Sequence, residues 1–426
     1  METVGRGILL ISPGSRGDVQ PFVALALGLE AAGHRVTVAA PENLRALVEH
    51  AGVRFLPLDV DFAALSDRPE LTAGNPLAHP RAMRRTMRDV VMPMMRRMLD
   101  GAADAAVGAE AIVHHPKLMG GDDLAAAHGI PGIAALTLPL LSPTRAFPPP
   151  GVINRDLGPF FNRASYRLVP LMNASYGPML RDWRRQRLGL RKAASTAGRL
   201  RLYCYSPAVV PTPPDWDDTS LATGYWELPL ASLPPAPAEL SAFLSDGSPP
   251  VAVGFGSMIG TDPAGMTATV VDALRRAGRR GVLITGGGGL VAEAVIGDDA
   301  IAVADVPHAW LFERVAAVVH HGGAGTTAAG LRAGRPTIVC PFIADQPFWG
   351  RAVQERGAGP APLPAKRLTP HALQDAIARA TTDAGIAQRA GELGERLRAE
   401  DGVGRTVQAI EERLSRGPRR GAAKPS

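Results

Sequence analysis

The sequence predicts an α/β protein with two domains, each built on a parallel β-sheet with helices on both faces. Apolar runs of four to six residues alternate with helical patterns in both halves of the chain, which is typical of buried parallel strands. A proline-rich stretch at residues 211–237 separates the two halves. The length of 426 residues also suits two domains better than one.

The first half opens with a strand-loop-helix-strand unit. The apolar run GILLIS (7–12) leads into the loop PGSRGD (13–18), and an amphipathic helix with a strand after it follows. Further apolar runs lie at 53–58, 109–116 and 129–136. In a parallel sheet such a loop lies at the carboxyl end of its strand, where ligands bind.

The second half repeats this alternation without repeating the sequence. Its apolar runs lie at 249–258, 281–289, 300–308, 316–323 and 335–342, each ending in glycine, proline or polar residues. The predicted organisation is an N-terminal domain at 1–210, a linker at 211–237, a C-terminal domain at 238–404, and a terminal helix with a disordered tail at 405–426.

Composition excludes several classes of protein. The net charge of +6 is spread along the chain, so no nucleic-acid partner is expected. No apolar run is long enough to span a membrane, and the first ten residues are too short for a signal peptide. Two cysteines cannot form a disulfide framework, so we expect a reducing cytoplasm, with Cys340 as a small buried residue.

Arginine is concentrated in two stretches, at 81–98 and at 181–192. The favoured interpretation is that both are solvated helix faces. A peripheral contact with acidic lipid headgroups is the alternative.

The stretch with the most candidate functional residues is VVHHGGAGTTAAG, at 318–330. An apolar strand ends at two histidines, and a glycine-rich turn then enters a helix. The glycines let a ligand approach the backbone, and the helix start offers unpaired N–H groups and partial positive charge. This combination predicts an anion site, most often for phosphate, at which a histidine adds one more donor.

A second pair of polar residues, Asp345 and Gln346, follows the next apolar strand and reaches the same sheet edge. A carboxylate beside an amide suits adjacent sugar hydroxyls. A diphosphate next to a sugar is a nucleotide-sugar. Neither a P-loop nor GxGxxG is present here. The Asp59-Val60-Asp61 triplet resembles a metal-binding motif, but it follows a strand of the other domain and carries little weight.

At these residues the chain resembles glycosyltransferase family 1, in the branch with sterol glucosyltransferases and actinobacterial antibiotic glycosyltransferases. The segments GSRGDVQPFVALALGLEAAGHRVTVA, TGYWEL and VGFGSM are similar to that branch as well. The resemblance runs from about residue 8 to about residue 404. It implies the two-domain GT-B fold, with Rossmann-like domains facing each other across a cleft, and a metal-independent, inverting transfer without a cofactor.

The resemblance also implies a donor-binding set, which is completed by loop residues of the N-terminal domain. His320 would meet the donor phosphates, and Val306 would offer its backbone to the base. The donor-binding residues that the resemblance implies are Ser257, Val306, His320, Gly322, Gly323, Gly325, Thr326, Asp345 and Gln346. We expect Ala324 and Gly17 beside them; Ser15 and Arg16 are loop residues by default and would contact the phosphates or the sugar if the domains close. The chain departs from many relatives at Asp305, where they carry an aromatic residue.

The candidate general base is Asp18. In the family the base is commonly a histidine in a Gly-His-x-x-Pro setting, and here that setting reads Gly-Asp-Val-Gln-Pro at 17–21, which resembles the aspartate variant. An ordinary aspartate is ionised but weakly basic at neutral pH, so it would act in concert with bond formation or be raised by burial. The competing interpretation makes Asp18 the N-cap of the helix.

Acceptor binding has weaker candidates in His114, Met83 and Met87. His114 and His115 end an apolar run of the first domain, and the methionines lie on the apolar face of a helix that Pro93 would bend. The competing interpretations are that the two histidines are loop residues hydrogen-bonded within the protein and that the methionines pack in the core. Methionine would also suit a variably shaped apolar pocket.

The favoured function is therefore transfer of a hexose from a UDP- or dTDP-sugar to a hydroxyl of a hydrophobic acceptor, such as a natural-product aglycone or a sterol-like lipid. Four alternatives remain open: a cell-wall lipid-intermediate transferase, a nucleotide-sugar epimerase, a non-catalytic nucleotide-sugar binder, and a dehydrogenase, which the missing GxGxxG disfavours.

Overall fold

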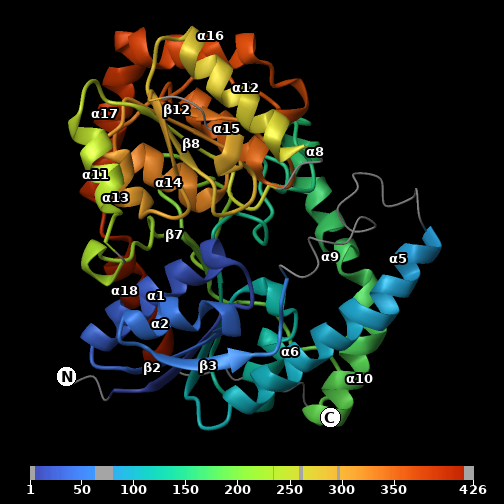
Figure 1. Ribbon diagram of the computed structural model, residues 1–426. Coiled ribbons are helices and arrows are strands. Elements are labelled where there is room, and N and C mark those ends of the chain that lie inside the picture. Colours follow the sequence, from blue (N-terminus) through green and yellow to red (C-terminus); the bar gives the residue numbers. More distant parts are fainter. Residues whose placement is uncertain (1–4, 63–79, 234, 259–261, 295–297, 417–426) are drawn as a thin grey trace.

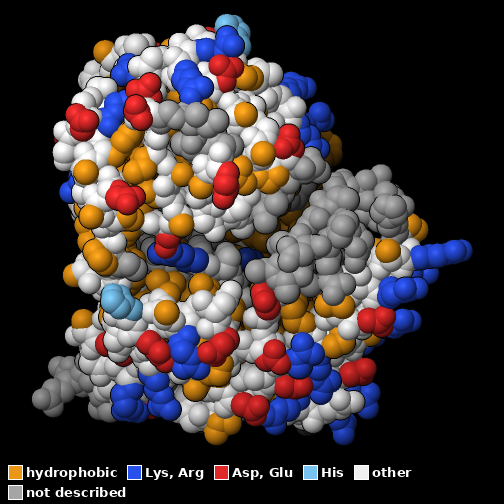
Figure 2. Space-filling model, viewed as in Figure 1, with side chains coloured by type: hydrophobic (Ala, Val, Ile, Leu, Met, Phe, Trp, Pro, Cys, Tyr) orange, Lys and Arg blue, Asp and Glu red, His pale blue; other side chains and the backbone are white. Residues whose placement is uncertain are grey.

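Two parallel β-sheets organise the chain, one in each of two lobes (Figure 1), which confirms the predicted two-domain α/β architecture. The structure is a computed structural model that describes residues 5–62, 80–233, 235–258, 262–294 and 298–416. A groove separates the two lobes on the face that Figure 2 shows.

The N-terminal sheet has the strand order β3-β2-β1-β4-β5-β6-β7, and all neighbouring strands are parallel. The order reverses between β1 and β4, which pair directly, with Ile11 opposite His114. The strands are β1 (Gly7–Ile11), β2 (Arg35–Pro41), β3 (Arg54–Leu58), β4 (Ala111–His114), β5 (Gly132–Leu136), β6 (Arg201–Tyr203) and β7 (Ser220–Ala222).

Helices cover both faces of this sheet, because alternate residues of each strand point to opposite sides. Leu10 packs in a cluster with residues of α1, whereas Leu9 packs with residues of α6 on the other face. The helices are α1 (Arg16–Ala31), α2 (Arg45–His50), α5 (Pro80–Thr86), α6 (Met92–Ala105), α7 (Gly121–Ala127), α8 (Pro159–Ser165), α9 (Val169–Met172) and α10 (Gly177–Arg187).

The C-terminal sheet has the order β10-β9-β8-β11-β12, again parallel throughout. Here the order reverses between β8 and β11. The strands are β8 (Val251–Gly254), β9 (Gly281–Ile284), β10 (Ala300–Val303), β11 (Ala317–His320) and β12 (Thr337–Val339). The helices of this half are α11 (Ala238–Ser245), α12 (Pro263–Arg276), α13 (His308–Phe312), α14 (Ala324–Arg332), α15 (Gln346–Glu355), α16 (Pro370–Thr382), α17 (Ala384–Arg398) and α18 (Gly402–Ser415).

The domain boundaries differ from the expected ones at two places. β7 lies inside the segment expected to be a linker, and it pairs with β6 of the N-terminal sheet. The last described helix, α18, leaves the C-terminal domain and packs on α1 (Figure 1), where Val407, Ile410 and Leu414 complete the N-terminal core. The tail expected to be disordered lies outside the described residues from 417 onward.

A shared apolar cluster joins the two domains close to the groove. Tyr203, the last residue of β6, and Tyr205, two residues farther on, pack in one cluster with Phe348 and Trp349 of α15. The rings of Tyr205 and Trp349 meet edge to face at 6.1 Å. Because aromatic pairs of this kind bury large apolar areas, the cluster fixes how the two domains face each other.

The methionine-rich helix contains a π-helical turn, η2 (Met87–Val91), between α5 and α6. Pro93, in the first turn of α6, lacks an N–H donor and would clash with the carbonyl four residues earlier, which accounts for a break at this place. Both cysteines are buried and free, as expected for Cys340. Among the described helices, none combines the length and the apolar character that crossing a bilayer requires.

Candidate functional site

The candidate site lies where the strand order reverses in each sheet. Asp18 comes after β1, and His115 and Lys117 come after its neighbour β4. In the other domain Ser257 follows β8, and His320 ends its neighbour β11. Loops diverge at such switch points and leave a crevice at the carboxyl ends of the strands, which is the usual ligand site of open α/β sheets.

Asp18 is not the N-cap of α1, so that part of the competing interpretation is wrong. The helix begins at Arg16, Ser15 is its N-cap, and Asp18 stands at the third helical position. The Asp18 carboxylate accepts a hydrogen bond from the backbone N–H of Ser15 at 2.8 Å and one from its hydroxyl at 3.1 Å. Asp18 therefore closes the first turn from inside the helix, as the acidic residue of a capping box does.

The same carboxylate has two partners from the loop after β4. The ammonium of Lys117 donates to Oδ2 at 2.6 Å, and Nε2 of His115 lies 3.6 Å from Oδ1. Burial alone would raise the pKa of Asp18, but the charge of Lys117, helped by His115 and the hydrogen bonds of Lys117 and Ser15, lowers it to about 2. Asp18 is thus an ionised carboxylate with a donor on each side.

His115 is neutral in this setting. Burial lowers the pKa of its ring to about 4, against the opposing charge of Asp18. Its Nδ1 accepts a hydrogen bond from the backbone N–H of Lys117 at 3.2 Å, so the ring proton is on Nε2, facing Asp18. His115 is therefore placed to orient Asp18 rather than to accept a proton.

Gly14 makes room for the Asp18 carboxylate. A Cβ atom at this position would lie 2.1 Å from Oδ2 of Asp18, so any other residue would displace the carboxylate or the loop. This is a close approach that the loop sequence PGSRGD contains but that sequence analysis did not assign.

The structure places His115, rather than His114, beside Asp18. His114 lies on the same side of β4 as Ile112, which packs in the cluster of α6. Its Nε2 is 3.4 Å from Oδ1 of Asp122 at the start of α7. The alternation of side chains along a strand was the signal that separates the two histidines. Lys117, which sequence analysis missed, lies two residues farther on.

Across the groove, His320 is buried with one ring nitrogen unused. Nδ1 accepts a hydrogen bond from the N–H of Gly322 at 2.9 Å, which puts the proton on Nε2. Nε2 has no hydrogen-bond partner among the described residues. Burial, with His321 and His308 nearby, lowers the pKa of His320 well below its usual value, so the ring is a neutral donor.

The loop after His320 is shaped for close approach. Gly322 has φ +93°, and a Cβ there would meet Val339 at 2.7 Å, so glycine is required. Gly323 is the N-cap of α14 and has no capping side chain, while Gly325 faces open space. The N–H groups of Ala324, Gly325 and Thr326 belong to the first turn of α14, where no intrahelical acceptor exists.

Thr326 is partly buried in this turn, and the hydroxyl of its neighbour Thr327 is already engaged in a hydrogen bond. The Thr327 hydroxyl donates to the carbonyl of Gly323 at 2.9 Å. The turn therefore presents backbone donors, the Thr326 hydroxyl and the positive end of the α14 dipole toward the groove.

Asp345 is held by a residue that sequence analysis missed, Trp349. The indole N–H of Trp349 donates to Oδ2 of Asp345 at 2.8 Å, and the ring is buried in the cluster that joins the domains. Burial raises the pKa of Asp345, and the hydrogen bond from Trp349 opposes this rise. Two charges of the other domain also act on this pKa: Lys117 lowers it and Asp18 raises it. Asp345 therefore faces the Asp18 group across the groove.

Gln346 is already engaged within its own loop. Its Oε1 accepts hydrogen bonds from the N–H groups of Phe342 at 2.7 Å and Ile343 at 3.0 Å, and its Nε2 lies 3.1 Å from the sulfur of Met258. Its carbonyl thus shapes the loop that carries Asp345, and the amide nitrogen is the part left for a ligand.

Arg16 spans the groove instead of lying free. Its guanidinium donates to Asp305 at 2.9 Å, an exposed ion pair between the first loop of one domain and the residue before Val306 of the other. Val306 itself packs its side chain in the core. Ser15, Gly17 and Ser257 are exposed at the ends of their strands.

The methionines expected at an acceptor site lie at the edge of the N-terminal domain. Met87 packs against the cluster of α6, and Met83 is partly buried on α5. Asp59 of the metal-like triplet pairs with Arg97 at 2.8 Å, on the surface. No group of histidine, cysteine and acidic residues with metal-binding geometry occurs among the described residues.

Comparison with known proteins matches each half of the chain to a family. Residues 8–143 match the glycosyltransferase family 28 N-terminal domain, and residues 289–412 match the family described as erythromycin biosynthesis protein CIII-like, C-terminal domain.

Two relatives match nearly the whole of this chain. A sterol 3-beta-glucosyltransferase of Arabidopsis thaliana is 37% identical over 95% of this chain, which spans 65% of that relative's length. O-mycaminosyltylonolide 6-deoxyallosyltransferase of Streptomyces fradiae is 36% identical, with 95% of this chain and 97% of the relative covered.

A solved structure with the same fold is the glycosyltransferase SsfS6 of Streptomyces sp. SF2575, complexed with thymidine diphosphate. It superimposes with a TM-score of 0.62 at 21% sequence identity and covers 96% of this chain and 99% of its own. This agreement confirms the GT-B arrangement that the resemblance implied.

Proposed function

Because the chain belongs to the glycosyltransferase family of the sterol 3-beta-glucosyltransferases and O-mycaminosyltylonolide 6-deoxyallosyltransferase, we propose that it transfers a hexose from a nucleoside diphosphate sugar to a hydroxyl of an apolar acceptor. The observation that carries the proposal is the buried Nε2–H of His320, which has no partner among the described residues and lies just before the first turn of α14.

The C-terminal half supplies the donor site. His320 would donate to a phosphate oxygen, and the N–H groups of the first turn of α14 would bind the others. As the bond from the anomeric carbon to the β-phosphate oxygen breaks, its electron pair leaves with the diphosphate. Fixed donors and the helix dipole stabilise that charge without needing to reorganise. The proposal is metal-independent, because these groups occupy the role a cation would have.

The N-terminal half supplies the base. Asp18 would take the proton of the acceptor hydroxyl as its oxygen bonds to the anomeric carbon from the face opposite the leaving diphosphate, which inverts the configuration. Asp18 and His320 come from opposing domains, and this supports approach from opposite faces. In the unliganded protein Lys117 occupies Oδ2 of Asp18, so the acceptor hydroxyl would approach Oδ1 or displace the ammonium.

The sugar would meet the carboxylate of Asp345, whose Oδ2 accepts a hydrogen bond from the indole N–H of Trp349. A partly exposed carboxylate can accept hydrogen bonds from sugar hydroxyls, which favours a hexose with its hydroxyls intact. The acceptor class rests on the relatives, which are named for a sterol and for O-mycaminosyltylonolide. UDP- and dTDP-sugars both fit the donor proposal.

The test begins with calorimetric titration of the chain with UDP-glucose, dTDP-glucose and UDP-N-acetylglucosamine in the presence of EDTA. Saturable binding of one donor is expected. That donor is then incubated with sterols and macrolide aglycones, and the anomeric configuration of the product is determined by NMR. Absence of binding to all three would contradict the donor site, and conversion of a donor without acceptor would favour an epimerase.

A further inference from the structure

An arm of the N-terminal domain exposes an unusual run of large apolar side chains. Of the eight exposed large apolar residues in the described part of the chain, five lie within residues 160–172. Their exposed fractions are Phe160 75%, Phe161 63%, Leu168 43%, Leu171 64% and Met172 56%. Single exposed apolar residues are ordinary, but a contiguous group of them marks a binding surface.

The arm is a nearly continuous helical segment formed by α8, the short turn Tyr166–Leu168 and α9. Phe161, Leu168 and Met172 are spaced by seven and four residues, so they lie along one side. Phe160 and Leu171 lie on the adjoining stripe, together with Arg163 and Arg167. The exposed surface is therefore a mixed apolar and basic face rather than a frayed core helix.

The opposite side anchors the arm to the domain. Asn162 is buried and bonds through its amide to the carbonyl of Arg145 at 3.2 Å and to Asp156 at 2.7 Å. Tyr166 is buried and lies with its hydroxyl 3.4 Å from the carbonyl of Pro139. These contacts hold α8 and the turn after it against the domain, whereas α9 has no buried residue.

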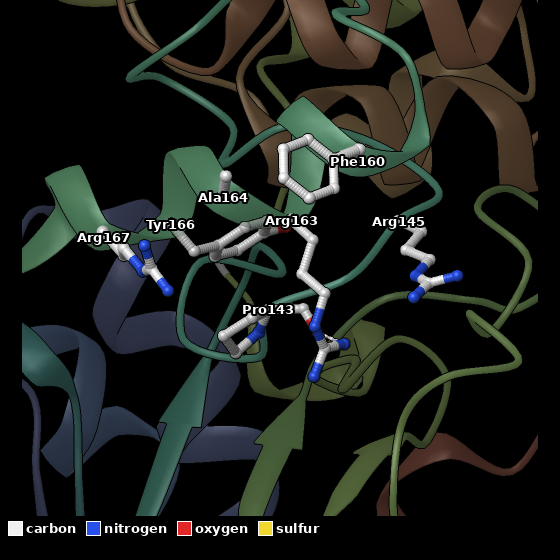
Figure 3. Close-up of a pocket in the computed structure, with 7 residues that line it drawn as sticks. All are labelled: Pro143, Arg145, Phe160, Arg163, Ala164, Tyr166 and Arg167. Carbon is white, nitrogen blue, oxygen red and sulfur yellow. Dashed lines mark hydrogen bonds between the residues drawn. The ribbon is translucent and has the colours of Figure 1, made fainter.

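A pocket with a volume of about 410 Å³ opens beside this apolar face (Figure 3). Three arginines line it with Phe160 and Tyr166. Arg163 pairs with Asp215 at 2.9 Å, whereas the guanidinium groups of Arg145 and Arg167 have no ion pair with a described residue. From 145 to 172 the sequence holds four arginines against one aspartate, so the face carries net positive charge.

We propose that this arm, residues 159–172 with Arg145, docks the protein on the surface of an anionic phospholipid membrane. The phenylalanines, leucines and methionine would enter the boundary between headgroups and acyl chains, as the apolar side of an interfacial helix does. Arg145 and Arg167 would bind lipid phosphates, for which a planar guanidinium is well suited. The charge of the face is what selects a membrane over an uncharged apolar partner.

The test uses the full chain and co-sedimentation with phosphatidylcholine vesicles, with and without phosphatidylglycerol. Wild type is expected to bind the anionic vesicles in preference. Phe160→Ser with Phe161→Ser should lower the partition coefficient by at least about tenfold, since each phenylalanine loses most of its transfer to an apolar phase. The double variant Arg145→Gln with Arg167→Gln should lower the partition coefficient by roughly fivefold for each charge removed. This loss should appear only with anionic vesicles at low salt.

The matched control is Val107→Ser, which removes an apolar side chain that is 73% exposed in the turn before β4 and should leave vesicle binding unchanged. Circular dichroism establishes that each variant is folded. Wild type that stays in the supernatant with both kinds of vesicle would overturn the proposal. Loss of a dimer in light scattering, with no vesicle binding, would assign the face to self-association instead, and altered acceptor KM with unchanged vesicle binding would assign it to the acceptor site.

Discussion

The two loops that face each other across the groove are built in opposite ways. After β1, the Asp18 carboxylate is ionised and accepts hydrogen bonds from Ser15 and Lys117, and Nε2 of His115 lies 3.6 Å from its Oδ1 without a hydrogen bond. After β11, His320 is neutral and buried, with its Nε2–H unused. The carboxylate of Asp18 thus already accepts hydrogen bonds from protein groups, whereas the Nε2–H of His320 has no acceptor among the described residues.

This difference indicates what each half of the site must do. An unused buried donor costs free energy in the unliganded protein, and a phosphate oxygen would remove that cost on binding. The donor side is therefore preorganised. A fully partnered carboxylate is stable but weakly basic, so the acceptor side would need the substrate to change its surroundings before it can take a proton.

The largest effect is expected from Asp18→Asn, which keeps the shape of the side chain and removes the base. Transfer should fall by about 10²- to 10⁴-fold, the usual range for a lost general base, while donor binding measured by calorimetry stays close to wild type. Asp59→Asn is the matched control, because Asp59 is a surface carboxylate paired only with Arg97 among the described residues. Unaltered turnover of Asp18→Asn would remove Asp18 from the base role.

His320→Ala tests the other side of the comparison. Loss of a neutral donor to a charged phosphate should weaken UDP-sugar and free UDP alike, by about 10- to 100-fold in Kd, because such hydrogen bonds contribute roughly 1.5–3 kcal/mol. Calorimetry with both ligands measures this, and His371→Ala on the exposed surface of α16 serves as control. An unchanged Kd would place the phosphates elsewhere.

Lys117→Met should change how transfer depends on pH. Removing the ammonium leaves only His115 and the Ser15 hydrogen bond to oppose burial, so the pKa of Asp18 rises from about 2. The base works only when ionised, so activity should now fall as the pH drops through the raised pKa, where wild type keeps Asp18 ionised. The pH profile of kcat/KM between pH 4 and 7 measures this.

Lys117→Arg restores the charge and should restore the wild-type profile. If Lys117 had only a structural role, Lys117→Met would lower the rate equally at every pH. Equal loss across the profile would therefore contradict control of Asp18 by Lys117.

The smallest effect is expected from Arg16→Ala. The Arg16–Asp305 pair is exposed, and pairs of this kind contribute about 0–1 kcal/mol, so the donor KM should change by less than about fivefold. The change should shrink further at high salt. A loss comparable to that of His320→Ala would mean that Arg16 leaves Asp305 and binds the donor directly.

Sequence reasoning placed Asp18 and His320 at strand ends because apolar periodicity and glycine-rich turns act over a few residues. It missed two partners of Asp18, His115 and Lys117, and Lys117 lies 99 residues from Asp18 along the chain. Lys117 meets Asp18 because β1 and β4 are neighbours in the sheet, and the local sequence pattern does not reveal the order of the strands. The role of Trp349 in holding Asp345 likewise depends on a cluster drawn from both domains.

By itself the sequence determined the two parallel-sheet domains, the glycine-rich turn at 322–326 and the position of Asp18 shortly after the first strand, since each follows from residue spacing and backbone chemistry. Only the tertiary structure decided the charge state and partners of Asp18, the path of α18 back onto α1, and the pairing of Arg16 with Asp305. The physical reason is the distance along the chain over which each kind of interaction acts. Helix starts and strand alternation arise from neighbouring residues, whereas burial and Coulomb interactions act between groups that meet only when the sheets and the two domains have come together.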